Sequence, residues 1–252
     1  MHTAVVFIAV AALIASACAA EESATTAGGP ATTMLVTSTA STASTTKVAP
    51  SAPTTTTTST RTPVGEPALG LPTGSLLGVV GVAHDDALNL RAGPSATSEI
   101  LATLEPTETA IVTTGRARLQ PAAIWFEVDA ADSEGWVHAG YVAFLGATDD
   151  ATAEAVAAGG GVPTAPSMEE LGRGVVAALS GGITASRVTM SVEPSFGDLA
   201  ETTFDVVGLE DDSVLGYRLH IFADDTTAGF SLHSIERTWF CVRGVDAAGL
   251  CV

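Results

Sequence analysis

Hydrophobic and polar positions in the first half of the chain predict a series of short β-strands. Runs rich in Val, Ile and Leu, several of them alternating with polar residues, are separated by turn residues such as Gly, Pro and Asp. These runs occupy residues 76–82, 88–91, 100–104, 109–113, 124–128 and 135–142. Short strands that recur every 10 to 15 residues, with turns between them, predict a small β-barrel.

The C-terminal part of the chain predicts one helix followed by four strands. Ser167 and Glu170 have the spacing of a capping box, and Gly181 is placed to end the helix. Between these ends, apolar residues at helical spacing give one apolar face: Met168, Leu171, Val175 and Leu179. Strand-like runs follow at residues 186–192, 202–207, 214–222 and 230–242. A helix followed by an antiparallel sheet is an α+β arrangement.

Three segments of the barrel region resemble, in their order, the signature of the bacterial SH3-type (SH3b) domain. They read Asn-Leu-Arg-Ala-Gly-Pro-Ser at residues 89–95, Trp-Phe-Glu-Val at 125–128, and Gly-Trp-Val-His at 135–138 followed by Tyr141 and Val142. The resemblance implies an SH3-like β-barrel that binds a ligand and carries no catalytic machinery of its own. Such domains are similar to modules that bind cell-wall peptide, glycan or protein segments on exported proteins.

The resemblance also suggests where a ligand would bind. A binding groove needs exposed aromatic faces and a few hydrogen-bonding groups. The candidates of these kinds are Trp125, Tyr141, Arg91 and Asn89. Each has a structural alternative, because the aromatic residues can belong to the core or its rim and the two polar residues can brace a turn. Trp136, in contrast, is expected in the core.

One segment departs from the family pattern. Residues 115–123 are longer than the tight connection that is usual at this place. We expect them to protrude as a loop, with Arg116 and Arg118 forming a basic spot on an otherwise acidic domain.

The N-terminus predicts export. Residues 4–15 form an apolar run that is too short to span a bilayer and is typical of a secretory signal peptide. The run ends in Ala-Ser-Ala-Cys at 15–18, which resembles a lipobox, where a signal peptidase cuts before a cysteine that carries a diacylglyceryl group. The resemblance implies a lipid anchor at Cys18 on the outer face of the cytoplasmic membrane. Cleavage after Ala19, which would give a secreted protein, is the alternative.

A Thr/Ser-rich segment follows. Residues 23–63 contain sixteen Thr, six Ser and no aromatic residue. A segment of this composition cannot bury enough apolar surface to offset the entropy of ordering its backbone. We therefore expect a disordered stalk, either O-glycosylated or unmodified.

Together these patterns predict a mainly β protein of five segments. They are a signal peptide (1–17), the anchor cysteine with its disordered linker (18–66), an SH3-like barrel (67–146), an Ala/Gly linker (147–165) and a separate small α+β domain (166–252).

The strong negative charge excludes one class of partner. The formal net charge is −18, and from residue 67 onward 25 acidic residues face eight Arg. Such a surface repels nucleic acid phosphates, which need Lys and Arg to replace their counterions. The charge serves solubility or, alternatively, recruits a cationic partner.

The cysteines fit an exported protein. Cys241 and Cys251 lie ten residues apart, with Gly244 and Gly249 between them to permit a turn. In an exported chain this spacing predicts a disulfide, with a free thiol pair or a metal site as alternatives.

The sequence offers little support for catalysis. It contains no Gly-x-Ser-x-Gly elbow and no His-x-x-x-His pair. The acidic clusters do not follow the spacing of a dedicated calcium loop. We therefore expect no catalytic residues, no metal and no cofactor.

The leading hypothesis is a non-enzymatic cell-envelope lipoprotein. Its barrel would bind a cell-wall peptide or glycan, or an exported protein, and its anchor would hold it at the membrane. One alternative is an enzyme that acts on the wall through an unrecognised catalytic C-terminal domain. Another is a purely structural lipoprotein that only contacts another protein.

Overall fold

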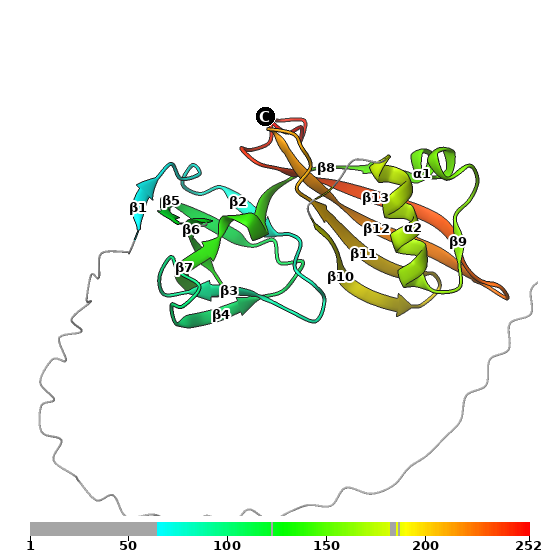
Figure 1. Ribbon diagram of the computed structural model, residues 1–252, viewed down its shortest axis with the longest axis horizontal. Helices are drawn as coiled ribbons and strands as arrows, with labels where there is room; N and C mark the ends of the chain where they lie inside the picture. The colour runs from blue at the N-terminus through cyan, green and yellow to red at the C-terminus, as the bar shows by residue number, and fades with distance from the viewer. Residues whose placement is uncertain (1–64, 122, 182–184, 186) are drawn as a thin grey trace, which may run out of the picture. The chain divides into compact units, whose positions relative to one another are not determined.

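The structure of the protein is a computed structural model that describes residues 65–121, 123–181, 185 and 187–252 (Figure 1). The expected signal peptide, Cys18 and nearly all of the stalk lie outside the described residues. The part that is described is mainly β, with strands from β1 to β13 and the helices α1 and α2. No helix within it is both long enough and apolar enough to cross a membrane.

The first half of the described chain forms an antiparallel SH3-like barrel. Its hydrogen-bonded strands follow the order β8-β2-β5-β6-β7-β3-β4, and β1 adds to β5. The strands are β1 (Glu66–Ala68), β2 (Leu76–Val79), β3 (Leu88–Arg91), β4 (Ile100–Leu104), β5 (Ile111–Gln120), β6 (Ala123–Ala130), β7 (Ser133–His138) and β8 (Val142–Asp150). They surround an apolar core that includes Leu77, Leu90, Ile111, Val128 and Val137. The strands that the sequence predicted in this half are confirmed, although several are longer or shorter than expected.

Strand β8 belongs both to the barrel and to a second sheet. Near its start Ala143 pairs with Gly78 of β2, and further along Leu145 pairs with Phe240 of β13. Ala143 and Phe240 share a small buried cluster with Val80, which comes from the barrel. The two halves of the protein are therefore joined by continuous hydrogen bonding and by a common patch of core.

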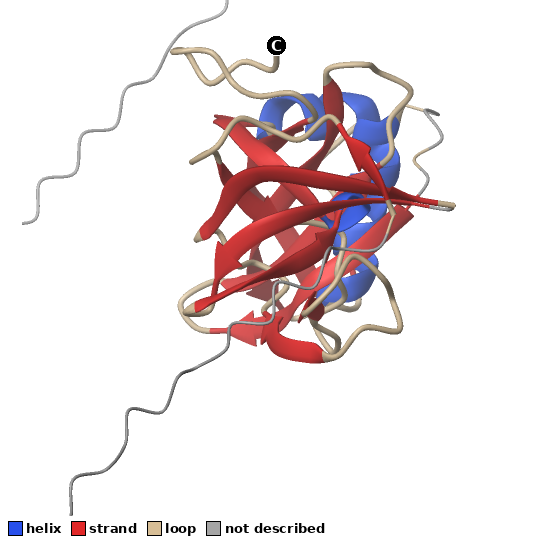
Figure 2. Ribbon diagram, turned by 90° about the vertical axis from the view of Figure 1, so that its left-hand side faces the viewer, coloured by secondary structure: helices blue, strands red, loops and turns tan. Residues whose placement is uncertain are grey.

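The second sheet has the strand order β10-β11-β12-β13-β8, and the short β9 pairs with β13. Its strands are β9 (Thr164–Ala165), β10 (Arg187–Phe196), β11 (Ala200–Val207), β12 (Val214–Thr226) and β13 (Gly229–Cys241). The helices α1 (Thr152–Gly159) and α2 (Met168–Ser180) lie together at one side of these strands (Figure 2). They cover a core that includes Leu171, Val175, Phe204, Leu219 and Ile235.

Helix α2 confirms the capping pattern read from the sequence. The Ser167 hydroxyl accepts a hydrogen bond from the Glu170 N–H at 3.2 Å, which satisfies one of the free donors at the helix start. Gly181 ends the helix in the left-handed region with φ 54°. The expected apolar face, led by Leu171 and Val175, is buried against the sheet.

The prediction of a protruding loop at residues 115–123 was wrong. β5 runs on to Gln120 and forms a hairpin with β6. Two features favour the strand: β1 pairs along β5, and the Arg116 side chain forms ion pairs with Glu127 of β6 and Glu134 of β7. Gly115, with φ 87°, lies at the irregularity in pairing that allows the long strand to bend. Arg116 is therefore charge-matched rather than part of a basic spot.

Residues 147–165, expected as an Ala/Gly linker, carry regular structure. They contain the end of β8, helix α1 and β9. Low sequence complexity suggested a linker, but alanine is also the best helix former. Ala151 and Ala155 are buried in the same core as α2, so this segment packs on the second sheet.

The predicted disulfide between Cys241 and Cys251 is confirmed. The sulfur atoms are 1.94 Å apart and the Cα atoms 5.1 Å apart. Cys241 is fully buried at the end of β13, so the bond fixes the C-terminal residues to the core of the barrel.

Candidate functional site

The four candidate residues of the barrel line a single hollow. It has a volume of about 440 Å³ and is lined by Asn89, Arg91, Trp125 and Tyr141 together with residues from neighbouring elements. We name this hollow the barrel groove. The other side chains used below also line it: Asp86, Ala96, His138 and Arg187. Residues that the sequence places far apart are thus brought together by the fold.

Strand β3 supplies the polar wall of the barrel groove. Its residues alternate, with Leu88 and Leu90 buried in the core and Asn89 and Arg91 less buried. Arg91 Nη1 donates a hydrogen bond to the Ser98 carbonyl at 2.8 Å. Arg91 therefore braces the turn after β3 and also faces the groove.

Three rings form a row along the groove. The His138 ring lies edge-on to Trp125, with ring centres 5.5 Å apart, and edge-on to Tyr141, with ring centres 5.4 Å apart. Trp125 is only 6% exposed, so most of this ring is packed and only a small part of it is open to solvent. Trp136 is buried, as expected.

The surroundings of His138, at the middle of the row, favour its neutral form. Its Nδ1 accepts a hydrogen bond from the Gly140 N–H at 3.0 Å. Burial lowers the pKa of His138, and the positive charge of Arg187 lowers this pKa further. With Nδ1 acting as acceptor, the neutral ring carries its proton on Nε2.

Arg187 reaches the groove from β10, the first strand of the second sheet. Its Nη2 donates to the Gly140 carbonyl at 2.9 Å, and its guanidinium carbon lies 4.5 Å from the centre of the Tyr141 ring. This is the distance of a cation–π contact. The groove therefore has one wall from the barrel, and β10 of the second sheet adds Arg187 and Thr189 to its lining.

Comparison with protein families decides what the barrel is. The family model of the bacterial SH3 domain matches residues 86–143. The chain contains a bacterial SH3 domain. Asn89, Arg91, Trp125 and Tyr141 all lie inside the matched residues. Comparisons with curated proteins and with solved structures gave no match.

Among the groove residues that the sequence did not single out are His138 and Arg187. His138 follows directly on the Gly-Trp-Val of the SH3 domain, and its place next to Tyr141 could have suggested it. Arg187 lies outside the SH3 domain, and no local pattern connects it with Tyr141. Only the packing of β10 against the SH3 domain brings the two together.

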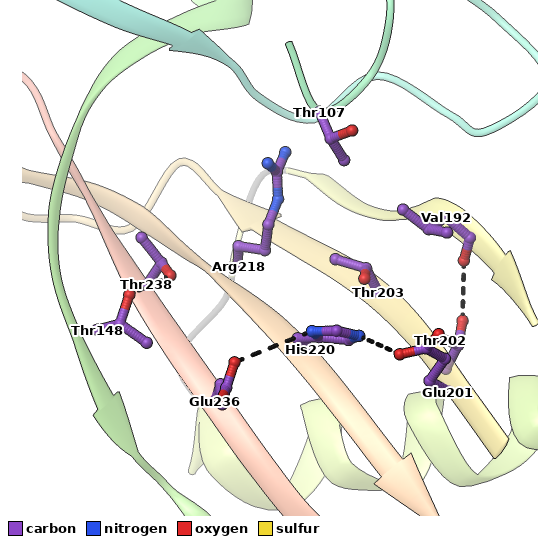
Figure 3. Close-up of a pocket in the computed structure, with 10 residues that line it drawn as sticks. All are labelled: Thr107, Thr148, Val192, Glu201, Thr202, Thr203, Arg218, His220, Glu236 and Thr238. Carbon is purple, nitrogen blue, oxygen red and sulfur yellow. Dashed lines mark hydrogen bonds and ion pairs between the residues drawn. The ribbon is translucent and has the colours of Figure 1, made fainter. Parts of the chain in front are cut away.

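A second hollow of about 430 Å³ lies on the face of the second sheet that is turned away from the helices (Figure 3). His220 lies there between Glu201, at 2.9 Å, and Glu236, at 4.0 Å. The Thr148 and Thr238 hydroxyls are 2.7 Å apart. Much of the polar lining of this hollow is thus paired within the protein, which leaves fewer groups to bind a ligand.

The barrel groove is therefore the better candidate site. It offers cationic, amide and aromatic groups from several elements, which suit recognition of a small polar ligand. In the part of the chain that the structure describes, no group of three or more His, Cys, Asp or Glu side chains is placed to hold a metal ion.

Proposed function

We propose that this protein is a non-enzymatic cell-envelope protein whose SH3 domain binds a component of the cell wall in the barrel groove. The bacterial SH3 domain indicates a cell-wall-binding or interaction module. The observation that carries the proposal is the convergence of Asn89, Arg91, Trp125 and Tyr141 on one hollow. The sequence alone marks the same four residues as candidate ligand groups, and the fold places them together.

The chemistry of the groove supports binding rather than catalysis. Its side chains supply hydrogen-bond donors and ring edges, and His138, the lining residue best suited to act as a base, has its Nδ1 occupied by the Gly140 N–H. Among the described residues, the Asn89 side chain has no hydrogen-bond partner, so it can pair with a ligand in the groove.

The N-terminal segments supply the location in this proposal. Export would depend on residues 1–17, and acylation of Cys18 would anchor the protein at the outer face of the cytoplasmic membrane. A stalk of the length and composition of residues 23–63 would let the SH3 domain reach about 35 Å from the anchor. Such a tether would bring the barrel groove to the wall.

Blocking the groove tests the proposal. Ala96 is exposed and lines the groove, so Ala96→Trp should fill it without disturbing the core. Ala157 is exposed on α1, away from the residues that line the groove, and Ala157→Trp is the matched control. We expect the full-length protein and the Ala157→Trp control to co-sediment with purified, protein-free cell wall. Ala96→Trp should bind the wall at least about tenfold more weakly than the unmodified protein.

Other outcomes identify the alternatives. Release of soluble wall fragments by the purified protein alone would contradict the non-enzymatic proposal and favour a wall-acting enzyme. Failure to bind wall, together with capture of one exported protein through the groove, would favour the purely structural alternative.

A further inference from the structure

The barrel groove contains two arginines, Arg91 and Arg187, that form no ion pair with a carboxylate of the described residues. Of the eight arginines from residue 67 onward, five form ion pairs within the described chain: Arg116, Arg173, Arg218, Arg237 and Arg243. Of the three others, Arg91 and Arg187 both line the barrel groove. Acidic residues outnumber basic ones about threefold in this region, so two unmatched cations in one hollow require an explanation.

Arg187 retains an unused donor in a buried position. Its Nε is buried and makes no hydrogen bond within the described structure. The guanidinium packs against Gly81, because a Cβ added there would lie 2.5 Å from Nε. Gly81 has φ 64°, a conformation that favours glycine, and it also lines the groove. The backbone thus makes room for the Arg187 side chain at the wall of the hollow.

The aromatic groups of the groove do not favour sugar stacking. Trp125 is almost fully buried, and the Tyr141 ring already has the Arg187 guanidinium over it. Burial lowers the pKa of His138, which favours its neutral form, whereas both arginines are charged and repel a cation. These features favour an anionic group over a cationic ligand or a sugar ring.

A carboxylate suits this site better than a phosphate monoester. Arginine binds either anion through parallel N–H donors. However, Asp86 also lines the groove, and the chain from residue 67 onward carries a net charge of −17. Their repulsion acts about twice as strongly on a dianionic phosphate monoester as on a singly charged carboxylate. A phosphodiester carries only one charge, so stripping phosphate polymers from the wall is needed to separate it from a carboxylate.

We propose that Arg187 and Arg91 bind a carboxylate group of a cell-wall peptide in the barrel groove, with Asn89 pairing to the amide groups of that peptide. This inference rests on the proposed wall binding and names the chemical group that is recognised. Because Arg187 lies outside the SH3 domain, the second sheet contributes to the specificity of the SH3 domain.

Chemical modification of the wall and substitution of Arg187 together test this inference. The probes are native purified wall, wall whose carboxylates have been converted to methylamides, and wall stripped of phosphate polymers. The variants are Arg187→Gln and a control, Arg173→Gln. Arg173 is an exposed residue of α2 and, among the described residues, forms an ion pair with Glu169 alone. Affinity is measured by co-sedimentation of the full-length protein over a range of concentrations.

We expect amidation of the wall to weaken binding of the unmodified protein about tenfold, which corresponds to loss of a charge-assisted hydrogen-bonding pair. Arg187→Gln should cause a similar loss on native wall and little further loss on amidated wall. Arg173→Gln and phosphate stripping should leave binding unchanged.

The inference is overturned if the unmodified protein binds amidated wall as tightly as native wall. This comparison needs no variant, so it does not depend on how a substitution affects folding. It is also overturned if Arg187→Gln weakens binding equally on both walls, or if phosphate stripping alone abolishes binding. In these cases the comparison of Ala96→Trp with the unmodified protein on native wall still tests the proposed function. Weaker binding by Ala96→Trp would mean that the groove binds the wall through a group other than a carboxylate. Native wall that fails to bind the unmodified protein at all contradicts the proposed function itself.

Discussion

Asp205 and Arg218 form a buried ion pair that connects the second sheet to the SH3 domain. Asp205 is fully buried, and its carboxylate oxygens lie 2.7 Å from Arg218 Nε and 2.8 Å from Nη2. The carboxylate also accepts the Gly81 N–H at 2.7 Å. Arg218 Nη2 in turn donates to the carbonyls of Val79 and Pro106 at 3.0 and 3.1 Å. This pair and strand β8 join the two halves of the protein.

Breaking this pair should destabilise the protein strongly. Asp205→Asn leaves the Arg218 charge without its partner in a buried site, and we expect the free energy of unfolding to fall by about 3–5 kcal/mol. Urea denaturation measures this change. As a control, Glu169→Gln breaks the exposed pair with Arg173 and should cost less than about 1 kcal/mol. Equal, small effects of both substitutions would contradict the role given to Asp205.

Two glycines of helix α2 should respond oppositely to alanine. A Cβ at Gly172 would lie 2.2 Å from Phe204 Cε2, whereas nothing lies within 4 Å of a Cβ at the exposed Gly174. We expect Gly174→Ala to stabilise the protein by about 0.5–1 kcal/mol through helix propensity. Gly172→Ala should destabilise it by roughly 1–3 kcal/mol through overpacking. Thermal or urea unfolding of both variants tests this, and stabilisation by Gly172→Ala would disprove the close contact.

The disulfide should contribute to stability because it closes a short loop at the end of the fold. The two cysteines are ten residues apart, and the lost chain entropy of such a loop corresponds to roughly 3 kcal/mol. We expect Cys251→Ala to lower the free energy of unfolding by about this amount. The native protein should resist alkylation when no reductant is present. Labelling of both cysteines under these conditions would show that the bond is absent.

Stability should depend on pH through His138. Burial, and then the nearby Arg187 charge, lower the pKa of this residue in the folded protein. At pH values between the lowered pKa and the ordinary value of about 6.5, the unfolded chain binds more protons at this residue than the folded chain does. The contribution of His138 is therefore fully present above about pH 6.5 and is lost as the pH falls through the lowered pKa.

Comparison with His138→Gln isolates this effect, since all other titrating groups are common to both proteins. We expect the unmodified protein to lose more stability than the variant between about pH 7 and pH 5. Parallel stability curves over that range would refute the assignment.

The sequence predicted those features that are encoded by neighbouring residues. The alternation in β3 (Leu88–Arg91) and the capping of α2 by Ser167 are local, and the structure has both. The site residues inside the SH3 domain were accessible through the family resemblance. In each case a residue and its neighbours in sequence were sufficient.

The remaining features depend on contacts between distant segments. β5 extends where Arg116 pairs with Glu127 of β6 and Glu134 of β7, and α1 forms where Ala155 packs into the core it shares with α2. Arg187 lies 46 positions after Tyr141, and only the arrangement of the two halves places it over that ring. No pattern in a single segment predicts such contacts.

The most direct test of the central claim is to locate the ligand on the protein. Backbone amide signals of the isotope-labelled full-length protein can be followed by NMR while soluble fragments of purified cell wall are added. Binding in the barrel groove predicts that the largest shifts fall on Asn89, Arg91, Tyr141 and Arg187. Shifts centred on His220 and Thr203 in the second hollow, with those groove residues unchanged, would contradict the account.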